Sequence, residues 1–259
     1  MKMKPSKVLL MLSCVLMSSG CVIKEYRESC PCRLVLDFSE VDTAVAGSAD
    51  LYLTVPGGYV FSDTWESEAM ETDYTVTVPR TWLNVNVVSG DNGYFRESGL
   101  RIPFGKECPS VYIHSSTVNA DCEIWREVVR MRKNHCAVNI STKTEEGQGL
   151  SLRLLSNVCG YDVNGMPVEG PFRCDGVIDG EGLCRIVIPR QTDDHMIMEI
   201  IGDDGVVKRF ALGYYIAASG YDWTAADLKD IDLELDLAVV RLTIRIQGWD
   251  KEQVYDIVI

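Results

Sequence analysis

Basic residues are scarce in this sequence. Its 259 residues contain 25 Lys and Arg against 38 Asp and Glu, which gives a formal net charge of -13 at pH 7. Such an acidic surface repels nucleic acid and the head groups of anionic lipids. We therefore expect no nucleic acid among the partners, and no membrane contact beyond a lipid attached to the chain itself.

Patterns typical of enzymes and of metal sites are also lacking. The three histidines, His114, His135 and His195, stand far apart, and neither a glycine-rich phosphate loop nor a nucleophile elbow occurs. The acidic pairs at 193–194 and 203–204 lie beside turn residues, where carboxylates usually bond to the backbone. We predict no catalytic residue, no metal and no cofactor, and hence a protein that is not an enzyme.

A run long enough to span a membrane is missing, but a shorter apolar run begins the chain. The apolar residues 8–17 follow three lysines, Lys2, Lys4 and Lys7. This apolar run is about half as long as the roughly 20 residues that a membrane span needs. A positive start followed by a short apolar run is typical of a secretory signal peptide. We assign residues 1–20 to this signal.

Small residues at the end of the signal lead directly into a cysteine. The motif Ser18-Ser19-Gly20-Cys21 resembles a bacterial lipobox, with Ser18 at the place where Leu is usual. In a lipobox the cysteine receives acyl chains such as palmitate and becomes the new N-terminus, and several chains give a lasting tether. We predict lipidation at Cys21, with residues 21–31 as the lipidated tether. The alternative is a secreted protein with an incidental cysteine.

Ten cysteines are an unusual number for this length. Cys14 lies in the signal and Cys21 at its end, which leaves eight in the body of the chain. Export favours disulfides, yet eight cysteines allow about 105 pairings. Cys30 and Cys32 flank a proline without the second cysteine pair or the histidines that a zinc site needs. Buried free thiols and scattered disulfides both remain open.

Strict alternation of apolar and polar residues begins at Cys32. Leu34, Leu36 and Phe38 fall on one face, which is the period of a β-strand. Short strands at close intervals predict an all-β chain of two sandwich domains, at 32–127 and 128–259. Only residues 224–229 look helical. Further runs with the same period are 51–55, 74–78, 83–87, 110–114, 136–140, 150–154, 183–188, 196–200 and 206–210.

The clearest alternation lies near the C-terminus. Apolar residues alternate with charged ones over 231–236 and again over 241–246, and a last apolar stretch covers 254–259. The phase slips at Val239-Val240 with no turn residue between the two runs. One extra residue restores the apolar set to the same face, which favours a bulge in one long strand over a hairpin.

Several short motifs follow one another along the mature chain. They are Cys21, Cys30-Pro31-Cys32-Arg33-Leu34, Arg132-Lys133-Asn134, Gly160-Tyr161-Asp162, Ile188-Pro189-Arg190-Gln191, and then Gly220-Tyr221-Asp222-Trp223, Asp227-Leu228 and Gly248-Trp249. In this order they resemble the fimbrillin-associated anchor proteins of type V fimbriae, the protease-processed fimbriae that assemble by donor strands. The resemblance spans essentially the whole mature chain, and the additional cysteines depart from it.

The resemblance implies a fold, a place and a partner. The fold is two transthyretin-like Greek-key β-sandwiches in tandem, lipid-anchored at the surface of the outer membrane, at the base of a fimbrium. Stalk subunits of such fimbriae lose an N-terminal strand to a protease and accept a strand from a neighbour. The anchor stays uncleaved, contacts the stalk by β-strand edge pairing and limits fimbrial length.

Two questions about contacts and function stay open at this point. The C-terminal strands are the expected contact with stalk subunits, although such alternation is more often that of plain core. A surface adhesin or glycan-binding lipoprotein is the alternative function, with Trp65, Tyr94 or Trp125 as sugar platforms; a stalk or tip subunit is another. The candidate contact residues are Ile231, Leu233, Leu235, Leu242, Ile244 and Ile246.

Replacing Cys21 tests the lipid anchor. In cells fed a radiolabelled fatty acid, the wild-type chain incorporates label, whereas Cys21→Ala incorporates none and leaves the membrane fraction, because no acyl chain then holds it. Label that persists in Cys21→Ala, or a wild-type chain without label, contradicts the prediction.

Overall fold

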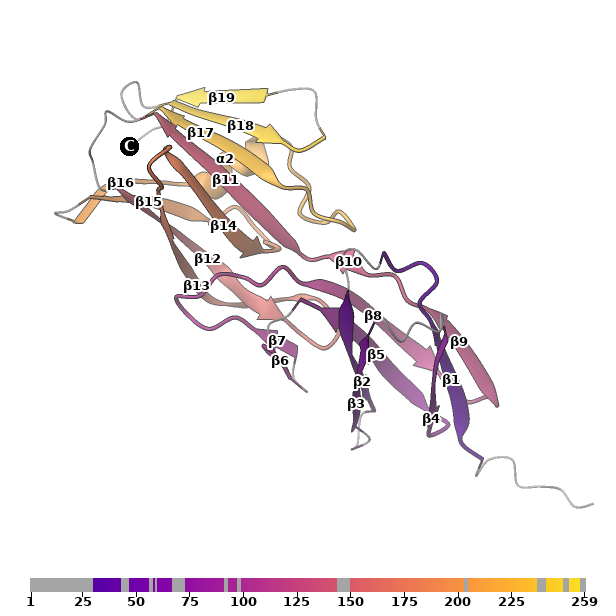
Figure 1. Cartoon of the computed structure of the whole chain (residues 1–259). Helices are drawn as coiled ribbons and strands as arrows, with labels where there is room; N and C mark the ends of the chain where they lie inside the picture. The colour runs from indigo at the N-terminus through magenta and orange to yellow at the C-terminus, as the bar shows by residue number, and fades with distance from the viewer. Residues whose placement is uncertain are drawn as a thin grey trace, which may run out of the picture.

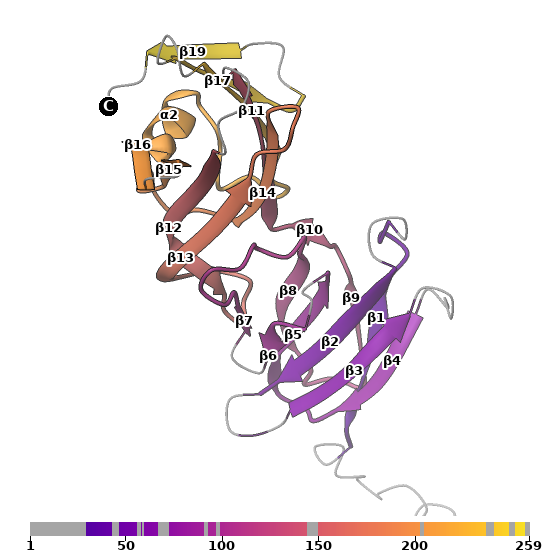
Figure 2. The same ribbon diagram turned by 60° about the vertical axis from the view of Figure 1, so that its left-hand side comes forward.

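The computed structural model describes residues 30–42, 47–55, 58, 60–66, 73–90, 93–96, 99–143, 150–202, 205–236, 241–248 and 252–256. The expected signal peptide and Cys21 lie outside these residues. Two lobes built of strands lie end to end (Figures 1 and 2), and each has its own cluster of buried apolar side chains. The expectation of an all-β chain is confirmed, while the transthyretin-like Greek-key description stays a prediction.

The N-terminal lobe packs a three-stranded sheet, in the order β4-β1-β9, against a five-stranded sheet, in the order β10-β8-β5-β2-β3. Leu34 and Leu36 of β1 are fully buried, and Phe38 stacks on Trp65 with ring centroids 4.2 Å apart. The face predicted from the alternation is therefore the core face. The strands are β1 (Cys32–Asp37), β2 (Ser48–Thr54), β3 (Val60–Glu66), β4 (Asp73–Val78), β5 (Trp82–Ser89), β8 (Tyr112–Asn119), β9 (Ile124–Val128) and β10 (Arg132–Lys133).

The C-terminal lobe has a five-stranded sheet in the order β14-β11-β17-β18-β19. A second sheet has the order β16-β15-β12-β7-β6, with β13 also paired to β12. Their buried residues form one core cluster. The elements are β6 (Phe95–Arg96), β7 (Gly99–Arg101), β11 (His135–Lys143), β12 (Ser151–Tyr161), β13 (Pro167–Val177), β14 (Leu183–Pro189), β15 (Ile197–Gly202), β16 (Gly205–Phe210), α2 (Leu212–Ala218), β17 (Ile231–Asp236), β18 (Arg241–Ile246) and β19 (Glu252–Asp256).

The chain passes between the two cores more than once. β7 pairs with β12, and Leu100 and Ile102 are buried in the C-terminal core although they precede β8 in sequence. Val129 is buried in the N-terminal core and β10 still pairs with β8. Residues on both sides of the expected 127/128 division therefore belong to the same lobe.

The single helix described is not where the sequence pattern predicts one. α2 covers 212–218, whereas residues 224–227 form turns and bends and residues 228–229 have no regular secondary structure. The carboxylate of Asp222 accepts bonds from the backbone N–H and the hydroxyl of Thr224. The prediction for 224–229 was wrong because Thr224, a residue suited to capping a helix, takes part in an Asx turn with Asp222 instead. α2 has only seven residues and no capping side chain, so its sequence carries little helical signal.

The expected bulge in one long C-terminal strand is also wrong. β17 and β18 form an antiparallel pair, with Ile231 opposite Ile246 and Asp236 opposite Arg241. The four connecting residues, 237–240, lie outside the described residues. Antiparallel pairing explains the phase slip, because residues opposite one another share a face.

Tyr161→Phe tests how the lobes are joined. The buried hydroxyl of Tyr161 donates to the carbonyl of Asn134 and accepts from the backbone N–H of Arg190 at 2.7 Å. Removing it leaves two buried backbone groups unpaired, so we expect the free energy of unfolding to fall by about 1–3 kcal/mol in urea titrations. The control is Tyr214→Phe, on a side chain that is 59% exposed, with a change below about 0.5 kcal/mol. Equal effects of the two changes would contradict this role.

Candidate functional site

The motifs between residues 132 and 228 that resemble anchor proteins converge on the junction between the lobes. Asn134, at the start of β11, accepts from Tyr161 through its carbonyl and from Arg190 through its side chain. Asp227 accepts a bond of 2.9 Å from the backbone N–H of Lys133, and the N–H of Leu228 donates to the Lys133 carbonyl at 3.2 Å. Segments that are 94 residues apart in sequence are thus held together by bonds to the backbone of Lys133.

Arg190 is the centre of this junction. Its guanidinium donates to the carbonyls of Trp223, Ala225 and Ala226, which lie at the end of the Gly220-Tyr221-Asp222-Trp223 motif and just after it. A planar guanidinium with five donors suits several carbonyls at once. A groove of about 520 Å³ lies beside it, lined in part by Met166 and Trp223. The motifs therefore stabilise the junction between the lobes, and their polar side chains bond largely to other residues of this junction.

The outer face of the C-terminal sheet carries polar side chains in rows across the strands. One row runs Arg185, Asn139, Asp232, Arg245 and Glu252, from β14 to β19. Opposite charges in neighbouring strands attract, and Arg245 donates to Glu252 at 2.9 Å. The alternating acids of 231–236 and the basic residues of 241–246 thus meet on the solvent side of the sheet.

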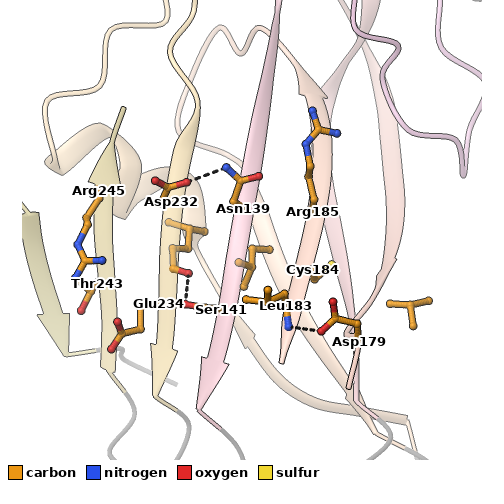
Figure 3. A pocket seen from close by; sticks show the side chains of 13 residues that line it. Asn139, Ser141, Asp179, Leu183, Cys184, Arg185, Asp232, Glu234, Thr243 and Arg245 are labelled. Atoms are coloured by element: carbon orange, nitrogen blue, oxygen red, sulfur yellow. Dashed lines mark hydrogen bonds between the residues drawn. The ribbon is translucent and has the colours of Figure 1, made fainter. Parts of the chain in front are cut away.

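A groove of about 550 Å³ crosses this face, and Figure 3 shows its side chains. Asn139 donates to Asp232 at 2.8 Å and Ser141 to the carbonyl of Leu233 at 3.3 Å. Leu183 is 46% exposed at one edge. The lining contains hydrogen-bonding groups of both kinds but no aromatic ring, so it offers polar contacts without a stacking platform.

The six residues predicted to contact stalk subunits lie in the core instead. Each is at most 4% exposed, and β17 and β18 are hydrogen-bonded to neighbours on both sides. Neither their side chains nor their strand edges are presented to a partner in this structure, since alternate residues of a sheet point to opposite faces. These residues are Ile231, Leu233, Leu235, Leu242, Ile244 and Ile246.

Among the described residues, a strand with a single neighbour does occur one strand further along. β19 ends the order β14-β11-β17-β18-β19, and its Val254 side chain is 52% exposed. The free backbone groups of an edge strand are a template for pairing with another chain. The sequence pattern could not reveal this, because it does not state which strand is last in a sheet.

The N-terminal strand is the other position that bears on assembly. β1 lies between β4, to which it is antiparallel, and β9, to which it is parallel. Arg126 of β9 forms ion pairs across one end of this sheet, at 2.9 Å to Asp37 and 2.6 Å to Asp73. The N-terminal lobe is therefore complete with its own first strand.

The aromatic residues of the alternative function are not gathered into a platform. Trp65 is 7% exposed and stacks on Phe38, while Trp125 packs against the N-terminal core and donates to Glu127. Tyr94 packs against the other core. The structure thus uses these three rings for packing.

The cysteines and histidines occupy separate environments. Cys30, Cys32, Cys108, Cys122, Cys136, Cys159, Cys174 and Cys184 are free thiols in this structure. The part of the chain described contains no cluster of three or more His, Cys, Asp or Glu residues arranged to hold a metal. Nor does it contain a helix long and apolar enough to cross a bilayer.

His114 and His135 are both buried. Nδ1 of His114 accepts from the backbone N–H of Arg130 at 3.1 Å, and Nδ1 of His135 lies 3.0 Å from the carbonyl of Val111. Burial lowers the pKa of both side chains below the ordinary value. His195, which is exposed, has its pKa raised by the hydrogen bond to Asp193.

Comparison with known proteins bears on the fold. No family model matches the chain, and no curated protein matches its sequence. A solved structure of a candidate polysaccharide-binding protein from Bacteroides thetaiotaomicron covers 88% of this chain and 98% of its own, with 14% identity and a TM-score of 0.62. A candidate adhesin from Bacteroides ovatus covers 86% and 95%, with 12% identity and a TM-score of 0.59.

The fimbrial anchor protein Mfa2 from Porphyromonas gingivalis is also similar. It matches over 85% of this chain and 98% of its own length, with 12% identity and a TM-score of 0.59. This chain has the fold of that anchor protein. The resemblance drawn from the sequence motifs is thereby confirmed at the level of the fold, and none of the three similar structures is described as an enzyme.

The buried histidines generate a pH prediction. A histidine whose pKa is lowered in the folded state takes up a proton more readily after unfolding. The free energy of unfolding is therefore highest above the unfolded pKa of about 6.5, and it decreases as the pH falls from there toward the folded pKa. Urea titrations should therefore give a lower free energy of unfolding at pH 5.5 than at pH 7.5, by at most about 1.4 kcal/mol per pH unit for each histidine.

Two variants separate this effect from that of other groups. In His114→Gln the loss between the two pH values should shrink, because the side chain no longer takes up a proton on unfolding. The exposed control His195→Gln should retain the full loss, since its pKa is shifted in the opposite direction. A pH dependence unchanged in His114→Gln would refute the assignment.

Proposed function

We propose that this chain is a non-catalytic, lipid-anchored outer-membrane protein that holds a donor-strand-assembled fimbrium to the cell and limits its length. The observation that carries the proposal is the central position of β1 in the β4-β1-β9 sheet. A stalk subunit of the family that the sequence resembles gives up its first strand and receives a neighbour's. This chain keeps that place filled with its own residues.

Energetics favour retention of β1. Leu34 and Leu36 are fully buried and Phe38 is 5% exposed, so removing β1 would open the core along a whole strand. Truncating one such side chain costs about 2–5 kcal/mol, and a typical domain is stable by only about 5–15 kcal/mol. In the described part of the N-terminal lobe, β1 thus fills the place that a donor strand would take, which supports the role of an end unit of a polymer.

The contact with the stalk is assigned to the edge of β19. In the described part of the chain, β19 has a neighbouring strand on one side only, and a strand added at its other edge would extend the five-stranded sheet. Val254, in the middle of β19, is exposed and apolar, as a side chain at such a contact should be. Growth at one end only, with a tether at Cys21 as predicted from the lipobox, accounts for anchoring and for a limited length.

A second candidate is a surface adhesin that binds glycans. The polar groove on the outer face of the C-terminal sheet favours it, and two similar structures are described as a polysaccharide-binding protein and an adhesin, each as a candidate. Sugar hydroxyls suit such donors and acceptors. Binding of the soluble chain to a glycan array, lost in Asp232→Ala, would favour this function over anchoring.

A complementation experiment tests the anchor function. Cells that lack the gene should make stalk protein but shed overlong fimbriae into the medium, and the wild-type gene should restore short, cell-bound fimbriae. Val254→Lys should fail to restore them, because a charged lysine on an edge strand opposes pairing, and we expect about a tenfold loss of affinity.

The matched control is Val60→Lys. Val60 is 48% exposed and lies at the start of β3, the last strand of the five-stranded sheet in the N-terminal lobe, so this variant should restore fimbriae fully. Fimbriae of normal length on cells without the gene would disprove the proposed function. Full rescue by Val254→Lys would disprove only the place of the contact.

A further inference from the structure

Two thiols meet at the start of the N-terminal strand. The Sγ atoms of Cys32, the first residue of β1, and Cys122, just before β9, lie 3.9 Å apart. Cys32 is fully buried, while Cys122 is partly exposed and packs against the same core. The two residues are separated by 90 positions in sequence, so the fold alone brings them together.

The backbone holds the two cysteines in place. The N–H of Arg33 donates to the carbonyl of Glu123 at 2.9 Å, and Arg33 lies opposite Ile124 in the parallel pair of β1 and β9. These strands lie side by side in Figures 1 and 2. Two sulfur atoms at van der Waals distance reach the bond length of about 2.05 Å by small side-chain rotations.

We propose that Cys32 and Cys122 form a disulfide that fastens β1 to the N-terminal lobe. Cys30 is two residues away and exposed, outside β1, and does not take part. Export, as the N-terminal segment predicts, delivers the chain to a compartment in which disulfides form.

The oxidant is a protein of the thiol–disulfide exchange class. The Cys122 thiolate attacks the disulfide of the oxidant, which gives a mixed disulfide and releases one oxidant thiol. The Cys32 thiolate then attacks the Cys122 sulfur and releases the second oxidant thiol. Two cysteine thiols lose two electrons and two protons, and one oxidant disulfide becomes a dithiol.

The order of the two steps follows from exposure. Cys122 is the sulfur that an oxidant can reach, whereas burial and the neighbouring thiol raise the pKa of Cys32 to about 11. A buried thiol that is rarely ionised is a poor first nucleophile. It can still resolve a mixed disulfide that is formed next to it.

The consequence concerns exchange of the first strand. A bond at Cys32 holds the start of β1 beside β9, so another strand cannot take its place while the bond is intact. This consequence of the disulfide rests on the proposed function, because strand exchange matters only in a donor-strand polymer. The bond itself does not depend on that function.

Peptide mapping tests the bond. The full chain is taken from cells into denaturant with N-ethylmaleimide, digested without reductant and analysed by mass spectrometry. Peptides that contain Cys32 and Cys122 should be found joined, and reduction should separate them. Cys30→Ser should retain the link and Cys122→Ser should lose it.

Hydrogen exchange supplies a second readout. Backbone amides of 33–37 should exchange on the order of tenfold more slowly in the oxidised chain than in Cys122→Ser, and reduction should remove the difference. Alkylation of both thiols, a link that disappears in Cys30→Ser, or equal exchange rates would overturn the proposal. Fimbriae that stay cell-bound without the link would leave the anchor function intact.

Discussion

β1 is hydrogen-bonded on both sides, and the organisation of the N-terminal lobe depends on this. Its buried face supplies Leu34 and Leu36 to the core, and its ends are tied down by Arg126 to Asp37 and by Arg33 to Glu123. A strand in the middle of a sheet contributes two ladders of hydrogen bonds as well as its apolar face. Removal of β1 would therefore break both ladders and expose the core of the lobe at once.

The second constraint is the junction around Arg190. Its bonds to the turn at 223–226 and to Asn134 connect the C-terminal motifs to the start of β11. β7 also pairs with β12, so the two lobes contact each other through several segments that are far apart in sequence. A protein that transmits force from a filament to a membrane benefits from such a junction, because lobes joined only by a linker would separate under load.

Part of this structure follows directly from the sequence. Alternation predicted the strands and their buried faces correctly, because residues that alternate with a period of two share one face only in a β-strand. It failed between β17 and β18, where a phase slip without a turn residue favoured a bulge although the two strands form an antiparallel pair. It failed again at α2, because Leu212, Tyr215 and Ile216 continue an apolar run from β16 with no capping signal.

Candidate sites were harder to predict than strands. Alternation marked Leu233 and Ile244 as apolar on one face, but only the strand order shows that both are enclosed and that β19 is the edge. The meeting of Cys32 with Cys122 needs a parallel pairing of strands some 90 residues apart. Among about 105 possible pairings of eight cysteines, composition alone cannot select one.

The mass and N-terminal residue of the protein isolated from outer membranes test the account most directly. The account predicts an acylated chain that begins at Cys21 and contains β1 in full. A chain that begins beyond Asp37, with β1 removed by a protease, would contradict it and would make this protein a polymerising subunit.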